Sequence, residues 1–294
     1  MSEIRMLASP SSQKKADRCR LLFQLQYLDR WEPREAERSL PARLRGSAFA
    51  RAAEVFHKAL MQGEKALLDD TDFVLSTVAE GIALFDRQFT YCIEKGISFA
   101  PDVDAISRAE LRRVIPLYAR HTPVRQWQQV TAVEKPNRTF SCRPDLEGVN
   151  SLGFYCVGDI KYKTSLEARY ESNTIEEFHW DPQFLQYNYA RKHDEGVPAD
   201  VPVYSILLLV VGSGFKIKQL EWLYTPEQLQ LWYQSALDLT QAVEGIRAGT
   251  VLPRASTTHK DNFGWCAMKR ACLEYNLDPE LMKQHYVQLD EMPE

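Results

Sequence analysis

RTFSCRPDLEGVNSLGFYCVGDIKYK, residues 138–163, is the segment around which the rest of the chain can be interpreted. Thr139–Cys142 and Phe154–Ile160 are rich in β-branched, aromatic and sulfur-containing side chains, which is typical of strands. The stretch Glu147–Gly153 between them contains two glycines, an asparagine and a serine, which favour a turn. The segment therefore predicts a β-hairpin with a loose connection.

Two carboxylates and a lysine come together in this predicted hairpin. Asp145 and Asp159 would lie on adjacent strands, where they can share one cation, and Lys161 follows Asp159 by two residues on the same face. Paired carboxylates hold divalent ions that polarise a phosphate and lower the pKa of a bound water. A lysine beside them can orient that water or neutralise charge on the phosphate. The pattern indicates phosphodiester hydrolysis, with a solvated surface hairpin as the alternative.

The composition is that of an ordinary globular protein. The 294 residues are 45% hydrophobic and 26% charged, enough chain for one large domain or two small ones. No apolar run approaches a membrane span, and residues 1–15 lack the apolar region of a signal peptide, so we expect a cytoplasmic protein. The six cysteines form no short disulfide-like pattern, which agrees with a reducing compartment. The net charge of −4 gives no overall basic character, although a local groove and metal ions can still bind a phosphate backbone.

The order Pro144-Asp145 followed by Asp159-x-Lys161 resembles the signature of the PD-(D/E)XK nuclease superfamily. A later Gln183-Phe-Leu-Gln-Tyr187 motif narrows the resemblance to the RecB-like and phage exonuclease branch. The resemblance implies an α/β, restriction-endonuclease-like core, a mixed β-sheet flanked by helices. It also implies a metal-dependent nuclease that acts on DNA.

The same resemblance extends to both ends of the chain. It includes a cysteine before an aromatic segment at Cys19–Tyr27, a Gly-Ser helix start at Gly46-Ser47, and clustered cysteines at Cys266 and Cys272. We accordingly expect one domain over residues 1–294. Its parts would be a flexible lead-in, a sheet core with the active site and a C-terminal cysteine-containing helical clasp, at residues 1–18, 126–224 and 250–294.

The resemblance also implies roles for individual residues. Asp145 and Asp159 would hold Mg²⁺ or Mn²⁺ with help from the backbone carbonyl of Ile160, and Lys161 would be catalytic. Gln183 and Tyr187 are four residues apart, so they lie on one face of a helix and would support the lysine or the substrate. Without the resemblance, a core tyrosine with an incidental glutamine would be the simpler interpretation.

Glu54 occupies the place of a further metal-coordinating acid in the family, in the middle of a predicted helix over Gly46–Met61. The family usually has a histidine four positions earlier, where this chain has Ala50. His57 lies one turn after Glu54, but nothing indicates that it substitutes. Glu54 is therefore either a metal ligand or a solvated carboxylate on the helix surface.

Charged residues between this helix and the hairpin offer two weaker candidates. Glu134 lies on a predicted strand over Trp127–Lys135, which with Thr139–Asp145 and Phe154–Lys163 would form a three-stranded meander. Several arginines could line a DNA groove or simply cover a solvated helix face. They are Arg108, Arg112, Arg113, Arg120 and Arg125.

Cys19, Cys266 and Cys272 match three of the four cysteines that bind an iron–sulfur cluster in some RecB-like nucleases. The fourth position falls at Phe263 or near His259, and only the histidine could bind iron. One missing thiolate usually abolishes a four-ligand site, so reduced, partly buried cysteines are the favoured interpretation. A zinc site from the same residues is a further alternative.

The remaining segments complete an α/β pattern. Pro33–Arg45 is charged and predicts a linker, whereas Val203–Val211 and Phe215–Tyr224 predict a second strand pair. Thr225 has the features of an N-cap for a helix that runs to about Arg247.

Together these features predict a metal-dependent deoxyribonuclease that acts in recombination, repair or phage DNA processing. The more specific prediction is an exonuclease. A recombination or helicase protein is an expected partner, and no membrane is involved. A nuclease-fold subunit retained for DNA binding or regulation is the alternative, because Ala50, the incomplete cysteine set and the acidic balance all favour it.

Overall fold

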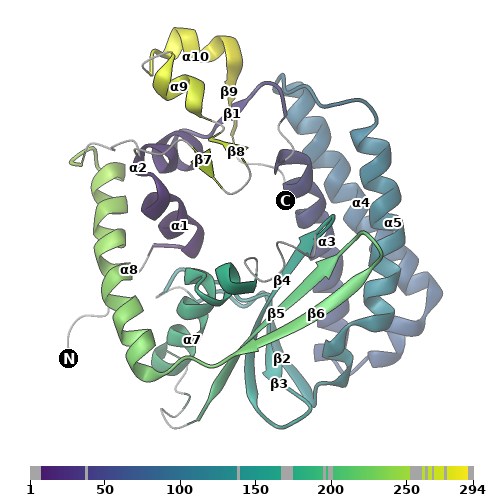
Figure 1. Cartoon of the computed structure of the whole chain (residues 1–294). Coiled ribbons are helices and arrows are strands. Elements are labelled where there is room, and N and C mark those ends of the chain that lie inside the picture. Colours follow the sequence, from purple (N-terminus) through teal and green to yellow (C-terminus); the bar gives the residue numbers. More distant parts are fainter. Residues whose placement is uncertain are drawn as a thin grey trace.

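Five strands form the central sheet in a computed structural model of the chain, which describes residues 8–36, 39–137, 140–166, 175–194, 197, 201–251, 260–261, 264–266, 268–274 and 277–290. In spatial order the strands are β2 Gln129–Val133, β3 Leu146–Val149, β4 Tyr155–Lys163, β5 Val203–Val211 and β6 Lys216–Trp222. β4 and β5 are parallel, and all other neighbours are antiparallel. The sheet is therefore mixed, as the sequence predicts (Figure 1).

Three long helices cover one face of this sheet. They are α3 Ser39–Met61, α4 Thr71–Glu94 and α5 Val103–His121, with a short 3-10 turn at Lys65–Asp69 before α4 and another at Pro123–Gln126 after α5. Buried side chains of α3 and α5 pack against alternate residues of the strands, among them Leu146, Ile160 and Ile206. Gly158 and Ile160 of β4 thus face these helices, and Asp159 and Lys161 must face the opposite side.

The opposite face carries α7 Pro182–Asp194 and α8 Pro226–Arg247. Because β4 and β5 are parallel, the chain has to cross over between them, and α7 lies in that connection. Phe184 and Leu185 pack α7 onto Val157 and Leu207 of the sheet. The crossover thereby places the first turn of α7 above the middle of β4. The capping box predicted at Thr225 is confirmed, with Gln228 as its second member.

Residues 10–18 do not form the flexible lead-in that we expected, whereas residues 1–7 lie outside the described residues. Pro10–Arg18 form α1, which packs beside α7 and α8 (Figure 1). The buried Gln13 donates a hydrogen bond to Gln186 of α7 over 2.8 Å, and Gln186 donates in turn to the backbone carbonyl of Phe140. Residues 10–18 are therefore part of the folded core.

The predicted hairpin forms, but one of its strands was placed wrongly. The strand that pairs with β4 is β3, not Thr139–Asp145. The described residues 140–142 lie in a turn, because Asn137 Oδ1 accepts the N–H of Phe140 over 3.0 Å and Ser141 has a positive φ of 48°. Local side-chain hydrogen bonding has overridden β propensity here. The turn between β3 and β4 is correspondingly shorter than predicted. Asn150 Oδ1 closes it by accepting the N–H groups of Leu152 and Phe154.

The predicted linker Pro33–Arg45 is also corrected. β1 spans Trp31–Pro33, and α3 already begins at Ser39, with Pro41 in its first turn. Proline is tolerated there because the N–H groups of the first turn have no partner within the helix.

Two segments that lie far apart in the sequence pair with each other, Trp31–Pro33 and Tyr286–Gln288. β1 pairs antiparallel with β9 Tyr286–Gln288, and Leu21, Leu22 and Met282 share one small core. Short elements complete this region: α2 Arg20–Leu22, a π-helical turn Phe23–Leu28, β7 Lys260–Asp261, β8 Gly264–Trp265, α9 Lys269–Leu273 and α10 Pro279–His285. Within the described ranges, no helix has the length and apolar character needed to cross a membrane.

Candidate active site

The two aspartates lie opposite each other at the start of the hairpin. Leu146 pairs with Gly158, so the preceding residue of one strand faces the following residue of the other, and these are Asp145 and Asp159. Asp145 Oδ2 accepts the backbone N–H of Ile160 over 2.6 Å. Asp159 is only 1% exposed. Strand register and one backbone hydrogen bond therefore fix both carboxylates.

Lys161 lies on the same face as Asp159, as the two-residue spacing predicts. Its Nζ is 2.6 Å from Asp159 Oδ2 and donates to Gln183 Oε1 over 3.1 Å. Both partners hold the ammonium beside the carboxylates, while 34% of the lysine side chain stays exposed. The ammonium is thus fixed, while part of the lysine side chain reaches solvent.

Gln183 and Tyr187 connect α7 to this pair. The amide Nε2 of Gln183 donates to Asp159 Oδ1 and to the Tyr187 hydroxyl, and that hydroxyl donates to the Arg143 carbonyl over 3.1 Å. Tyr187 is buried, and burial raises its pKa well above the usual value, so it remains a neutral donor. Since Arg143 lies two residues before Asp145, α7 braces both strands of the hairpin.

Burial shifts the protonation of the aspartates strongly. It raises the pKa of Asp159 to about 7, which Lys161 opposes and Asp145 reinforces. It also raises the pKa of Asp145 to about 7, again opposed by Lys161 and reinforced by Glu134, although Asp145 keeps some contact with solvent. Burial lowers the pKa of Lys161, but the two carboxylates outweigh it and the net shift is upward. The lysine is therefore charged, and the site holds more carboxyl groups than its single ammonium group can neutralise.

Glu134 and Glu54 bring further acid to the edge of the site. Glu134, at the end of β2, hydrogen-bonds with Asp145 and forms an ion pair with Arg143 over 2.7 Å. Glu54, on α3, is close enough to raise the pKa of Glu134. Its own carboxylate is paired with Arg51 over 2.8 Å and Lys58 over 2.5 Å. Glu54 thus lies near the site with its carboxylate already paired with two cationic side chains.

His57 does not face the aspartates. It is fully buried in the core, where its Nε2 lies 2.8 Å from the Tyr118 hydroxyl. Burial lowers the pKa of His57 to about 3, so the ring is neutral.

The arginines of the predicted groove lie on and after α5, on the far side of the sheet from Lys161. Arg108 pairs with Asp86, Arg113 donates to the carbonyl of Gly212, and Arg125 pairs with Asp69. These contacts favour the solvated-face interpretation over the groove.

The oxygen donors of the hairpin fit a hard divalent cation. Asp159 Oδ2 is buried and has no well-aligned hydrogen-bond donor, although Lys161 Nζ lies close to it. Within the described parts of the chain, no group of three or more His, Cys, Asp or Glu side chains is arranged to hold a metal. The ligand set would therefore be two carboxylates completed by backbone carbonyl and water, which suits ions that keep several waters.

Asp181 is a member of the site that the sequence did not single out as functional. Its Oδ1 accepts the N–H of Gln183 over 3.0 Å, and its Oδ2 lies 2.8 Å from Lys14 Nζ. The Asp-Pro start of a helix was its only local signal. Lys14, which comes from α1, had none.

Cys19, Cys266 and Cys272 pack around the same small core near the chain ends. Burial raises the pKa of Cys272 to about 11, and the other two thiols add to the shift. Cys19 acts as the N-cap of α2, because its sulfur accepts the N–H of Leu22 over 3.4 Å. His259 and Phe263 lie outside the described residues. Among the described residues of this region, no group of three or more His, Cys, Asp or Glu side chains is arranged to hold a metal ion.

Comparison with known proteins agrees with this geometry. A family model described as the PD-(D/E)XK nuclease superfamily matches residues 7–273, which include every residue of the hairpin and of α7. No curated protein matches the chain. The match and the five-stranded mixed sheet confirm the restriction-endonuclease-like fold that the sequence predicts.

Proposed function

Because the chain belongs to the PD-(D/E)XK nuclease superfamily, we propose that it is a Mg²⁺- or Mn²⁺-dependent deoxyribonuclease. The observation that carries the proposal is the ion pair between Lys161 and the buried Asp159, opposite Asp145. Exonucleolytic action in recombination, repair or phage DNA processing is the finer form of the proposal. It rests on the Gln183 to Tyr187 motif of the RecB-like and phage branch, and a recombination or helicase partner would accompany it.

Each residue of the site has a defined part in this proposal. Asp145 and Asp159 would hold a divalent ion, which would supply Lewis acidity to the phosphate and lower the pKa of a bound water. The carbonyl of Ile160 is the further ligand that we propose, and the carboxylate of Glu54 would act on the ion only through one of its waters. Lys161 donates hydrogen bonds toward the water and the phosphate, where its charge offsets negative charge that builds up during attack.

Gln183 has a positioning part. Its amide bonds to both Lys161 and Asp159, so it fixes the distance between the ammonium and the carboxylate. Tyr187 fixes the amide in turn.

The test of the proposal is degradation of end-labelled DNA by the purified chain. Single- and double-stranded linear DNA should be cleaved with Mg²⁺ or Mn²⁺ and left intact with EDTA, and a ladder that starts at one end would support exonucleolytic action. If the folded chain cleaves neither substrate with either metal, the nuclease proposal fails. A DNA-binding or regulatory subunit then becomes the better assignment, to be examined by titration with DNA at several salt concentrations.

Metal binding should depend steeply on pH. Asp145 and Asp159 both have pKa values near 7, and a cation can bind only after they lose their protons. Between pH 8 and pH 6 each carboxyl changes from mostly ionised to mostly protonated, so the apparent affinity should fall roughly tenfold for each. Mn²⁺ titrations followed by calorimetry would measure this, together with the protons released on binding. Equal affinity at both pH values would contradict the assignment of these ligands.

A further inference from the structure

Lys14 is held beside the active site by a residue that also touches the catalytic network. Its Nζ lies 2.8 Å from the buried Asp181, yet 61% of the Lys14 side chain is exposed. An ammonium carries three N–H donors, and Asp181 is the acceptor for one of those of Lys14. Asp181 binds the N–H of Gln183, and Gln183 binds Lys161 over 3.1 Å. A continuous chain of contacts thus links Lys14 to Lys161.

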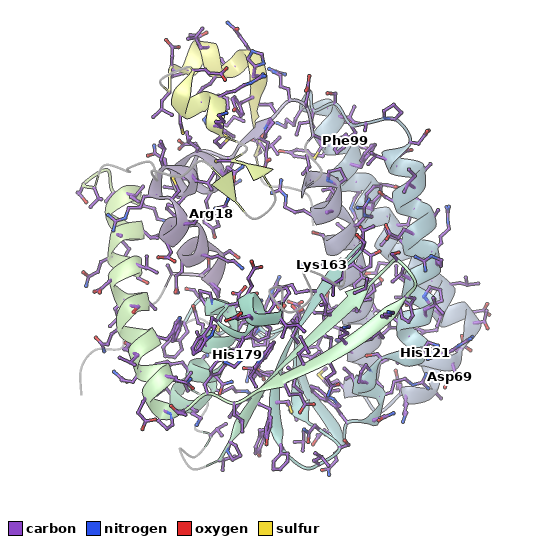
Figure 2. The ribbon with its side chains drawn as sticks, in the orientation of Figure 1. Arg18, Asp69, Phe99, His121, Lys163 and His179 are labelled. Atoms are coloured by element: carbon purple, nitrogen blue, oxygen red, sulfur yellow. The ribbon has the colours of Figure 1, made fainter. Side chains whose placement is uncertain are left out.

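Lys163 extends the same face of β4. It follows Lys161 by two residues, so the two side chains leave the strand on the same face, about 6.6 Å apart along the strand. Its Nζ lies 5.6 Å from the centre of the Phe178 ring, a cation–π distance. Figure 2 labels Lys163 in the middle of the molecule, between α1 and α3 in this view.

Lys163 and Lys14 are neighbours in electrostatic terms. Lys163 lies over the ring of Phe178, whose backbone carbonyl accepts the N–H of Asp181 over 3.1 Å, and Asp181 in turn holds Lys14 at 2.8 Å. One short segment thus gathers both lysines, and the charge of Lys14 accordingly adds to the lowering of the Lys163 pKa by burial, which Glu177 opposes. Two cations brought together from α1 and β4 raise each other's energy. An anion between them would relieve that repulsion.

We propose that Lys14 and Lys163 bind the backbone phosphate next to the scissile one, so that α1 is part of the substrate-binding surface. The inference rests on the proposed nuclease function and deepens it. The ligand is one phosphodiester group of a nucleic acid strand. Lys161 serves the cleaved linkage, and the other two lysines hold the neighbouring linkage in register with it.

The test combines lysine variants with altered oligonucleotides. The variants are Lys14→Gln and Lys163→Gln, singly and together, with Lys216→Gln on the exposed edge strand β6 as the matched control. The oligonucleotides carry either phosphates throughout or one neutral methylphosphonate beside the cleaved linkage, on each side in turn. On the normal strand, the double variant should lose roughly ten- to a hundredfold in kcat/KM, and the control should lose nothing.

The methylphosphonate strand separates substrate contact from a merely structural role. At the position that meets the two lysines, the native chain should be as slow as the double variant, and the double variant should lose nothing further. Lys14→Arg and Lys163→Arg, which retain the charge, should keep most of the native rate. An equal loss on every strand, or no loss on any, would overturn the inference.

If the native chain cleaves no DNA, the proposed function fails and binding decides the inference separately. In EDTA, the dependence of log affinity for single-stranded DNA on log salt should be shallower by about 0.7 in the double variant, because the two lysines neutralise one phosphate and each neutralised phosphate contributes about 0.7. An unchanged slope, or no binding by the native chain, would overturn the inference as well.

Discussion

Lys161→Ala should lower the rate of DNA cleavage by roughly a hundredfold to a thousandfold, the usual cost of removing one fixed donor from a transition state. The ammonium lies 2.6 Å from Asp159 and is charged because two carboxylates raise its pKa. Asp159 and Gln183 hold it in place. Single-turnover cleavage of end-labelled DNA at saturating Mg²⁺ would measure the loss of the chemical step.

The control variant is Lys216→Ala, which removes the same charge from β6 and should cleave at the native rate. Lys161→Met keeps the apolar stem of the side chain and distinguishes loss of charge from loss of packing. It should be as inactive as the alanine variant, with an unchanged circular dichroism spectrum. A folded Lys161→Ala protein that retains more than a tenth of the native rate would show that Lys161 is not catalytic.

Two contacts of the site could be predicted from the sequence, because each depends only on the local geometry of one strand or one helix. A two-residue spacing on a strand places Lys161 beside Asp159, and a four-residue spacing on a helix places Gln183 beside Tyr187. Lys14 and Asp181 are separated by 167 positions, and their meeting depends on how α1 packs against α7. No local pattern encodes that packing.

The fold errors have a similar physical origin. Thr139–Cys142 has strand-like side chains, but the Asn137 carboxamide closes a turn that β propensity does not reveal. The polar composition of residues 1–18 suggests a flexible segment, whereas Gln13 is buried with its amide nitrogen donating to Gln186 and to the carbonyl of Ala8. In both places side-chain hydrogen bonds outweigh the average behaviour of the residue types. Such bonds become visible only when both partners are placed.

Asp145→Asn should remove metal-dependent cleavage and yet make the protein more stable at pH 8 without added metal. Asp145 has a pKa near 7 in the folded chain and 3.8 as its ordinary value, so the folded state binds the proton more tightly than the unfolded state. The stability that this proton provides is complete below pH 3.8 and is lost as the pH rises through 7. Asparagine carries no charge and its Oδ1 can still accept the N–H of Ile160, so the variant escapes that loss and leaves Asp159 paired with Lys161.

The expected gain is about 1 kcal/mol, or about 2–4 °C in the melting temperature of a domain of this size, at pH 8, and it should vanish near pH 4. Cleavage should fall by roughly a thousandfold, because one of the two side-chain ligands of the cation is lost. Thermal melts at pH 4 and 8 with and without Mn²⁺ would measure both effects, and Asp238→Asn on the exposed surface of α8 is the control that should change neither. A less stable Asp145→Asn protein at pH 8 would mean that the carboxylate supports the fold. A more stable Asp145→Asn protein at pH 8 would mean that the native chain holds two buried carboxyl groups close together at a cost in stability. Such a cost is expected of a site that binds a cation.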